Sequence, residues 1–506
     1  MYENMYQDNQ LVIQGQMPGG GMNPDQRRST TALFPFEKAA LACLLYTLLY
    51  TFCIYKNISG ITVPVWAAGM IVLSCYFIKL AGKQLKKDSY FVIVMMMLIG
   101  VSTFFTGNEY IIWMNYPAEF LLLVSLLLHN FAEDSKWDMG KYFAEILNAV
   151  FGAIGCIGRP FSEGNAYIKK HKKESNGKWQ YVMIGIAIAI PCVLFLGFLL
   201  GTADKVFEHI LVSIFSSFTI PTRVFGIGFM LLFGFFSSYC GISYIADHSD
   251  KITVSPHKSG EPVLAITITG MIGVLYAFFS VIQIVYLFIG KMELPEGMTY
   301  AQYARTGFFQ LLFVCILNVI LVLSMKKYFK ESKVLNGILL MISGCTYIMT
   351  LSSAIRMCMY ISTYQLTFLR VFVLVALFTI AVLLVGVILT IVKPEFSFFR
   401  FGIVVISSVY VIFAFSHVDY FIAKYNLSKV QENVAGDPFG GRIADYQYIS
   451  NLSTDAAPVI VEYAEKNGLE KNAWFISYCN QNKHAVDEIT IRNFNVSHAI
   501  AKGMLE

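Results

Sequence analysis

The chain has 506 residues, of which 56% are hydrophobic, 15% aromatic and only 14% charged, with a formal net charge of +5. This apolar share exceeds that of an ordinary globular domain and excludes a single water-soluble core. The sequence therefore predicts an all-α integral membrane protein, with the lipid bilayer as its first partner.

The first 36 residues are predicted to form a disordered cytoplasmic tail. Most of this segment is polar and rich in Gln, Gly, Asn and Met, without an apolar stretch or a small-residue cleavage site. We therefore expect no cleavable signal peptide, so that the first apolar helix directs membrane insertion.

Residues 37–426 are predicted to form a polytopic transmembrane domain. A helix crosses the hydrocarbon core with about 20 largely apolar residues, and the sequence holds about eleven such stretches. The expected spans are 39–55, 61–78, 90–106, 110–130, 181–201, 223–246, 263–289, 306–325, 334–359, 366–392 and 401–423.

Two further helices, at 137–158 and 203–220, are predicted to lie along the membrane surface. In both, apolar residues recur at i, i+3 and i+4 while polar residues take the other side. Phe143 and Ile146, for example, oppose Lys141. This pattern is typical of helices that rest in the interface plane.

The distribution of Lys and Arg predicts the orientation, because these residues accumulate in cytoplasmic loops. With the N-terminus inside, the inner segments hold 23 basic residues and the outer segments hold 7. An odd number of spans then places the C-terminus outside. The inner sequence "IKKHKKESNGKW" (168–179) lacks interleaved aromatic residues for base stacking, so we expect no nucleic-acid partner.

Residues 427–506 are more polar and are predicted to form a small helical extracytoplasmic domain. They carry 7 basic and 10 acidic residues. Within "ISNLSTDAAPVIVEYAEKNG" (449–468), a Ser-Thr-Asp start signal precedes Pro458, and Gly468 marks the end of the helix. So small a domain is expected to bury its apolar faces partly against the membrane domain.

Several blocks of the sequence resemble a known family. They are "GTADKVFEHI" (201–210), "YARTGFFQLLFVCILNVILVL" (303–323), "TYQLTFLRVFVLVALFTIAV" (363–382), "DYFIAKYN" (419–426), "DYQYISNLSTDAAPVI" (445–460) and "IRNFNVSHAIAKGM" (491–504). These blocks are similar to the bacterial membrane family catalogued as domain of unknown function 4173, and to its relative 4153, over roughly residues 180–505. The resemblance implies a multi-pass protein of the bacterial cytoplasmic membrane. It implies no particular activity, because the family is one of unknown function.

Common catalytic and metal-binding patterns are missing from the sequence. It contains no G-x-x-x-x-G-K-[ST] loop, no G-x-S-x-G elbow and no H-E-x-x-H helix. Nine of the ten cysteines lie in or beside apolar helices, and only Cys479 lies in the C-terminal tail, without metal-ligand spacing anywhere. We therefore expect no metal or cofactor, and the prediction leans against an enzyme.

Charged residues inside apolar stretches give the best functional signal, because ions in hydrocarbon are costly. Three arginines lie at the outer ends of consecutive spans beside Tyr303, Tyr360 and Tyr364. The candidate counter-charges at the same level are Glu109, Glu119 and Asp419, the last of them beside His417. A guanidinium suits carboxylates and phosphates, which predicts a pocket for an anionic lipid or a small anionic ligand. The predicted ligand-binding residues are Tyr303, Arg305, Arg356, Tyr364, Arg370, Glu119 and Asp419.

A structural interpretation of the same residues stays open. Arg370 with Glu119, or Arg356 with Asp419, can form buried ion pairs that set the register of the helices. Arg370 can also reach the interface by extending along the helix surface.

Three classes of function fit this sequence. A sensing, regulatory or scaffold protein would use the C-terminal domain as input and 131–180, with a protein partner, as output. A transporter or channel would need a polar route, and the inner halves of most spans are nearly uncharged. An enzyme acting on lipid-linked envelope substrates would use Glu119 or Asp419 as acid–base groups. We predict the non-enzymatic sensing or scaffold role, with transport as a close alternative.

Overall fold

The computed structural model of the chain describes residues 34–134, 137–171, 222–249, 260–285, 308–393, 395–433 and 446–505, with a few single positions between 189 and 206. Throughout these ranges the chain is almost entirely helical. The helices are α1 (Phe36–Ile54), α2 (Thr62–Leu80), α3 (Ser89–Phe105), α4 (Glu109–Phe131), α5 (Met139–Gly155), α6 (Arg159–His171), α9 (Thr222–Ser249), α10 (Pro262–Gln283), α12 (Phe308–Tyr328), α13 (Lys333–Tyr364), α14 (Phe368–Val392), α15 (Phe398–Ala414), α16 (Val418–Asn433), α17 (Tyr446–Ser450), η4 (Thr454–Ala456), α18 (Ala457–Asn467), α19 (Ala473–Asp487) and α20 (Val496–Leu505).

Eight helices in the described part of the chain are long and apolar enough to cross a bilayer. Two bent pairs, α5 with α6 and α15 with α16, raise this number to ten if each pair is one span, and α3 is a shorter apolar helix of 17 residues. The protein is therefore a multi-pass membrane protein. The predicted span at 181–201, nearly all of the predicted surface helix at 203–220 and most of the N-terminal tail lie outside the described residues.

The helices bury small polar residues and expose large apolar ones. In α13, the hydroxyls of Ser343, Thr346 and Thr350 are buried, and each donates to the carbonyl four residues earlier. On α10, by contrast, Met271 is 74% and Val274 70% exposed. This arrangement suits a bilayer, because small polar residues let helices approach closely while hydrocarbon solvates the apolar side chains.

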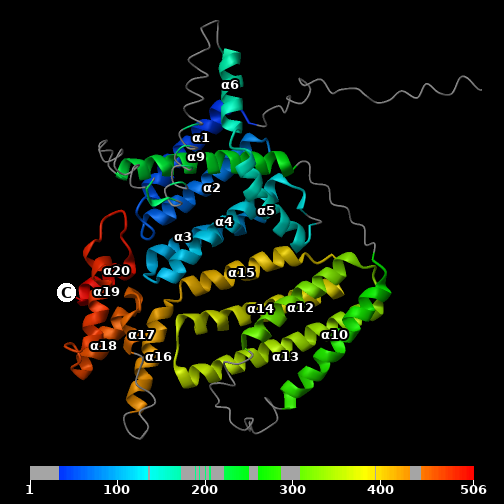
Figure 1. Ribbon diagram of the computed structural model, residues 1–506, viewed down its shortest axis with the longest axis vertical. Helices are drawn as coiled ribbons and strands as arrows, with labels where there is room; N and C mark the ends of the chain where they lie inside the picture. Colours follow the sequence, from blue (N-terminus) through cyan, green and yellow to red (C-terminus); the bar gives the residue numbers. More distant parts are fainter. Residues whose placement is uncertain are drawn as a thin grey trace, which may run out of the picture.

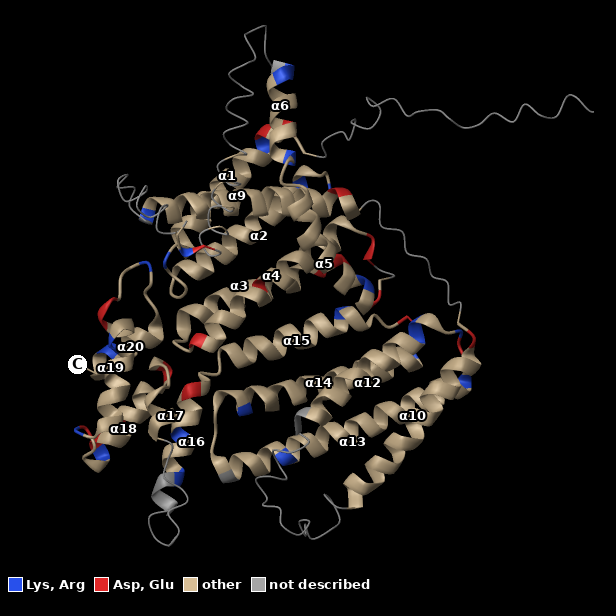
Figure 2. Ribbon diagram, in the orientation of Figure 1, with Lys and Arg blue, Asp and Glu red and all other residues tan. Residues whose placement is uncertain are grey.

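The helices form two groups joined by α15 (Figure 1). One group contains α1 to α5 with α9, and the other contains α10, α12, α13 and α14. Helix α15 packs against α14 on one side and against α3 on the other. Helices α17 to α20 form a compact C-terminal domain beside the ends of α3 and α16, and the charged residues gather mainly at helix ends and in loops (Figure 2).

The last predicted span, 401–423, is broken in the structure. Helix α15 ends at Ala414, and α16 starts at Val418 with a bend of 58°. Between them, His417 has φ of +47°, a left-handed conformation that a right-handed helix cannot contain. Helix α16 then packs on η4 and α18, so the predicted domain boundary at 426/427 falls inside a helix that supports the C-terminal domain.

Helix α5 presents its apolar side outward. Phe143 and Phe151 are 64% and 69% exposed, whereas Glu145 is 2% exposed and faces the protein. There Glu145 Oε1 lies 2.7 Å from Lys141 Nζ, and Oε2 lies 3.2 Å from His248 Nε2 of α9. The exposed apolar face fits contact with lipid, and the placement of 137–158 along the membrane surface stays a prediction.

Candidate functional site

Loops that the sequence assigns to one side of the membrane meet the C-terminal domain. In the α1–α2 loop, the N–H of Ile61 donates to the Phe494 carbonyl over 3.0 Å, and Thr62 Oγ1 donates to the Arg492 carbonyl over 3.2 Å. At the start of α14, the N–H of Phe368 donates to Tyr448 Oη over 2.8 Å. The domain therefore bridges both helix groups.

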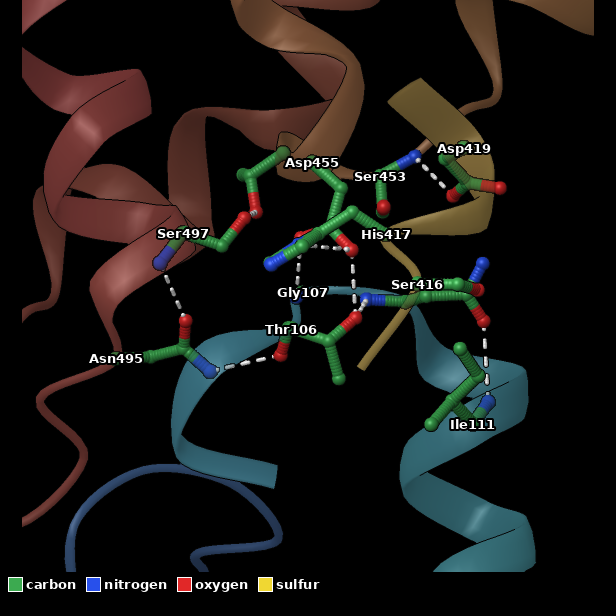
Figure 3. A network of polar contacts seen from close by, with 12 residues as sticks. Thr106, Gly107, Ile111, Ser416, His417, Asp419, Ser453, Asp455, Asn495 and Ser497 are labelled. Atoms are coloured by element: carbon green, nitrogen blue, oxygen red, sulfur yellow. Dashed lines mark hydrogen bonds and ion pairs between the residues drawn. The ribbon is translucent and has the colours of Figure 1, made fainter. Parts of the chain in front are cut away.

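The densest polar contact lies where the C-terminal domain meets the α3–α4 loop and the α15–α16 break (Figure 3). We call this group the junction; it consists of Thr106, Gly107, His417, Asp419, Ser453, Asp455, Asn495 and Ser497.

Asp455 of η4 is the centre of the junction. Its side chain is fully buried, and it accepts hydrogen bonds from Thr106 Oγ1 at 2.6 Å and from the Gly107 N–H at 2.7 Å. His417 Nδ1 lies 3.4 Å from Asp455 Oδ2. One carboxylate thus joins three segments that are far apart in the sequence.

The α3–α4 loop fits closely between these groups. A Cβ on Gly107 would lie 2.0 Å from Thr454 Oγ1, so a larger residue would displace the C-terminal domain. Asn495 Nδ2 donates to the carbonyls of Thr103 and Thr106 over 3.0 Å and 2.8 Å. A side chain of the C-terminal domain therefore supplies hydrogen bonds to backbone carbonyls at the end of α3 and the start of this loop.

The surroundings of Asp455 favour its ionised form. Burial raises the pKa of this carboxyl, but hydrogen bonds from His417, Gly107, Ser497 and Thr106 outweigh burial, and the net shift of the pKa is downward. The site is therefore a charged, hydrogen-bonded carboxylate paired with a half-exposed histidine.

Asp455 was not among the residues predicted from the sequence to form the site. It belongs to the Ser-Thr-Asp signal expected to start a helix, and the Ser453 side chain makes no capping bond to η4. Asp455 instead reaches the α3–α4 loop, 348 residues away in the chain. A start signal accounts for an acidic residue at this position, so nothing local in the sequence indicated that its carboxylate binds a distant loop.

Arg370 is compensated by its own neighbourhood. Its Nη1 donates to the Tyr364 carbonyl over 2.5 Å and also to the Gln365 carbonyl, and its guanidinium lies 4.5 Å from the Tyr360 ring centroid. These carbonyls follow the carboxyl end of α13, where a cation is favourable. The structure thus brings Arg370 to Tyr364 but not to Glu119.

The other predicted site residues lie apart from this group. Arg356 is 7% exposed, and its Nη2 donates to Gln283 Oε1 over 3.2 Å. Asp419 belongs to the junction, where it accepts from the Ser453 N–H over 3.1 Å. No ion pair joins Arg356 to Asp419 or Arg370 to Glu119, because Asp419 faces the C-terminal domain and Glu119 lies deep in α4. Tyr303 and Arg305 fall outside the described residues.

A second polar group, the Asp134 cluster, lies beyond the opposite end of α4 from the junction. Asp134 Oδ2 is 2.6 Å from His129 Nδ1 and accepts from the Tyr142 hydroxyl of α5. Burial raises the pKa of Asp134, but the hydrogen bonds from His129 and Tyr142 prevail and the net shift is downward. A cleft of about 470 Å³ beside it is lined by Lys83 and Lys86, among others.

The described residues contain no group of three or more His, Cys, Asp or Glu side chains that could hold a metal ion. The side chains available at the junction are two carboxylates, Asp419 and Asp455, one imidazole, one amide and several hydroxyls. The junction donors to Asp455, which are Thr106, Gly107, His417 and Ser497, all come from segments other than η4, which makes the site a connection between elements.

Comparison with known proteins gives one family. The family described as Domain of unknown function (DUF4153) matches residues 93–463. Of the two related families named from the sequence, 4153 is the one that matches. Membership in family 4173 stays a prediction. The match begins inside α3 and so includes α4, which the sequence resemblance had left out. No curated protein and no solved structure matches the chain.

Proposed function

We propose that this chain, which belongs to the family Domain of unknown function (DUF4153), is a non-enzymatic sensing or regulatory protein of the bacterial cytoplasmic membrane. In this proposal the C-terminal domain is the outward-facing input. The segment 131–180, with α5 and α6, is the cytoplasmic output and contacts a protein partner.

The observation that carries the proposal is the fully buried Asp455 carboxylate, bonded to Thr106, Gly107 and His417. A buried carboxylate of this kind is costly when it loses a partner. Any ligand that moves the C-terminal domain must therefore shift the α3–α4 loop with it or break these bonds. A site of this kind is better suited to transmit a conformational change than to catalyse a reaction.

Helix α4 supplies a physical connection between the two ends. It begins beside the junction, where Asn108 caps it by accepting from the Ile111 N–H over 3.0 Å. It ends beside the Asp134 cluster, which contacts α5 through Tyr142. A helix of 23 residues is about 34 Å long, enough to cross the hydrocarbon core.

The anionic ligand predicted from the outer arginines is a separate part of the proposal. Arg370 lies in the first turn of α14, and Arg356 lies eight residues before Tyr364, the last residue of α13. Their guanidiniums suit a lipid phosphate or a carboxylate. Because Arg370 already bonds to two carbonyls, such a ligand would add to its partners and is not needed to neutralise an isolated charge.

Hydrogen exchange of the full-length protein in lipid nanodiscs tests the transmission. We expect Asp455→Asn, which keeps the shape but loses the charge, to speed exchange in the α3–α4 loop by roughly tenfold or more, because hydrogen bonds to a charged group are weakened. If α4 transmits the change, exchange in α5 also rises. Asp487→Asn, on the exposed end of α19, is the matched control and should change neither region.

An effect confined to the C-terminal domain would contradict transmission. Solute flux through liposomes that contain the purified protein, abolished in Asp455→Asn, would replace this proposal with transport.

A further inference from the structure

Among the Asp, Glu, Lys, Arg and His residues of helices α1 to α4, Glu119 lies farthest from the helix ends. It lies ten residues after Glu109, the first residue of α4, which is about 15 Å along the axis and near the middle of a 30 Å hydrocarbon core. Its side chain is 1% exposed. Neither the junction nor the Asp134 cluster includes it.

Both carboxyl oxygens of Glu119 lack a hydrogen-bond partner. Oε1 lies against α3, 3.5 Å from the position that a Cβ on Gly100 would occupy. Gly100 is thus the residue of α3 that leaves room for the carboxyl group. Glu145 is a useful contrast, because it is equally buried but has Lys141 and His248 beside it.

The helices around Glu119 offer no counter-charge. In α2, α3, α4 and α15 the remaining residues that carry or can carry charge, apart from Tyr and Cys, lie at or near the helix ends: Lys79, Glu109, His129 and Arg400. Among the described residues, Tyr410 of α15 is a titratable neighbour of Glu119, and its hydroxyl donates to Asn115 Oδ1 over 2.6 Å.

An ionised carboxylate in such a place would be a buried charge without hydrogen bonds or a partner, the least tolerated state in hydrocarbon. The protonated acid avoids that cost. We infer that Glu119 is a proton-binding site in the middle of the membrane domain, which holds its proton in the conformation described here and releases it only when polar groups or water reach it. This inference does not depend on the proposed function.

Polar side chains provide a route from the junction toward this site. Asn115, one turn before Glu119 on α4, donates to Ser102 Oγ and Thr103 Oγ1 over 2.9 Å and 2.8 Å. The Thr103 carbonyl in turn accepts from Asn495 of the junction. These groups lead from the C-terminal domain to within one helical turn of Glu119. In this conformation the carboxyl group of Glu119 makes no hydrogen bond to them.

Infrared difference spectroscopy of the full-length protein in nanodiscs tests the protonation state. Near neutral pH, the wild-type spectrum minus that of Glu119→Gln should contain the carbonyl band of a protonated acid, at the high frequency typical of one without hydrogen bonds. Glu145→Gln, the matched buried and ion-paired control, should remove a carboxylate band. A carboxylate band lost in Glu119→Gln would overturn the inference.

Carbodiimide labelling of the wild-type protein keeps the test independent of how the variant folds. A hydrophobic carbodiimide reacts with protonated carboxyl groups in apolar surroundings, so mass spectrometry should find the adduct on Glu119, and this labelling should decline as the pH is raised. Absence of the adduct on Glu119 would contradict the inference. Protection of Glu119 by sodium ions would also contradict it, because a bound metal cation would then occupy the site.

Discussion

At the scale of single residues, Arg370 explains how a permanent charge is accepted in an apolar stretch. The sequence "LTFLRVFVLVALFTIAV" (366–382) places it in the first turn of α14. The structure gives it the carbonyls of Tyr364 and Gln365 and the ring of Tyr360. The charge is thus matched by the negative end of α13 and by an aromatic face.

This geometry predicts the effect of changing Arg370. Arg370→Gln should lower the free energy of unfolding by about 1–2 kcal/mol, because the charge-assisted bonds and the contact with Tyr360 are lost. Chemical unfolding in detergent, followed by fluorescence, measures this change. Lys330→Gln, which breaks an exposed pair with Glu261, is the control and should cost less than about 1 kcal/mol.

The same experiment separates the two interpretations of this arginine. Because Arg370 and Glu119 do not pair, exchanging their charges in a double variant should not restore stability. A restored free energy of unfolding would show that the two side chains meet after all.

At the scale of elements, α5 shows how far a periodic pattern can be interpreted. The spacing of Phe143, Ile146 and Phe151 predicts an amphipathic helix, and α5 is one. The pattern does not say which side faces the protein. Glu145 and Tyr142 turn inward because Lys141, His248 and Asp134 offer partners there. The apolar side is left for the surroundings.

Lipid contact of α5 can be measured directly. A tryptophan in Phe151→Trp should be quenched by brominated lipids, because position 151 is 69% exposed on the apolar face. Tyr142→Trp, on the opposite and buried side of the same helix, should be quenched much less. Equal quenching at the two positions would mean that α5 lies against another protein surface or in water.

At the scale of the whole molecule, the two sets of loops are held by different contacts. On one side, the C-terminal domain binds the loops after α1, α3 and α15 and the first residue of α14. At the opposite ends, ion pairs connect loops, such as Lys327 with Asp138 and Lys330 with Glu261. This separation agrees with the alternation that an α-helical membrane domain requires, while the direction across the membrane rests on the distribution of Lys and Arg.

The orientation predicts which side of the cell each set faces. In a cysteine-free background, Thr490→Cys in the C-terminal domain should react with a membrane-impermeant maleimide in intact cells. Gln84→Cys, in the α2–α3 loop, should react only after the cells are permeabilised. The reverse result would place the N-terminus outside and remove the outward-facing input from the proposed function.

The sequence by itself determined the features that depend on local composition. Long apolar runs must be helical in a bilayer, because every backbone N–H and C=O needs a partner within the segment. Apart from 401–423, which is divided between α15 and α16, the predicted spans that fall in the described residues correspond to helices, and Pro458 and Gly468 mark the start and end of α18 as predicted.

Only the tertiary structure decided which polar groups meet. Asp455 with Thr106, Arg370 with the end of α13 and the solitary Glu119 all depend on residues far apart in the sequence or on the absence of any partner nearby. Hydropathy responds to the cost of placing a residue in hydrocarbon, but it carries no information about which side chain offsets that cost. That choice is made when the helices pack and bring their loops together.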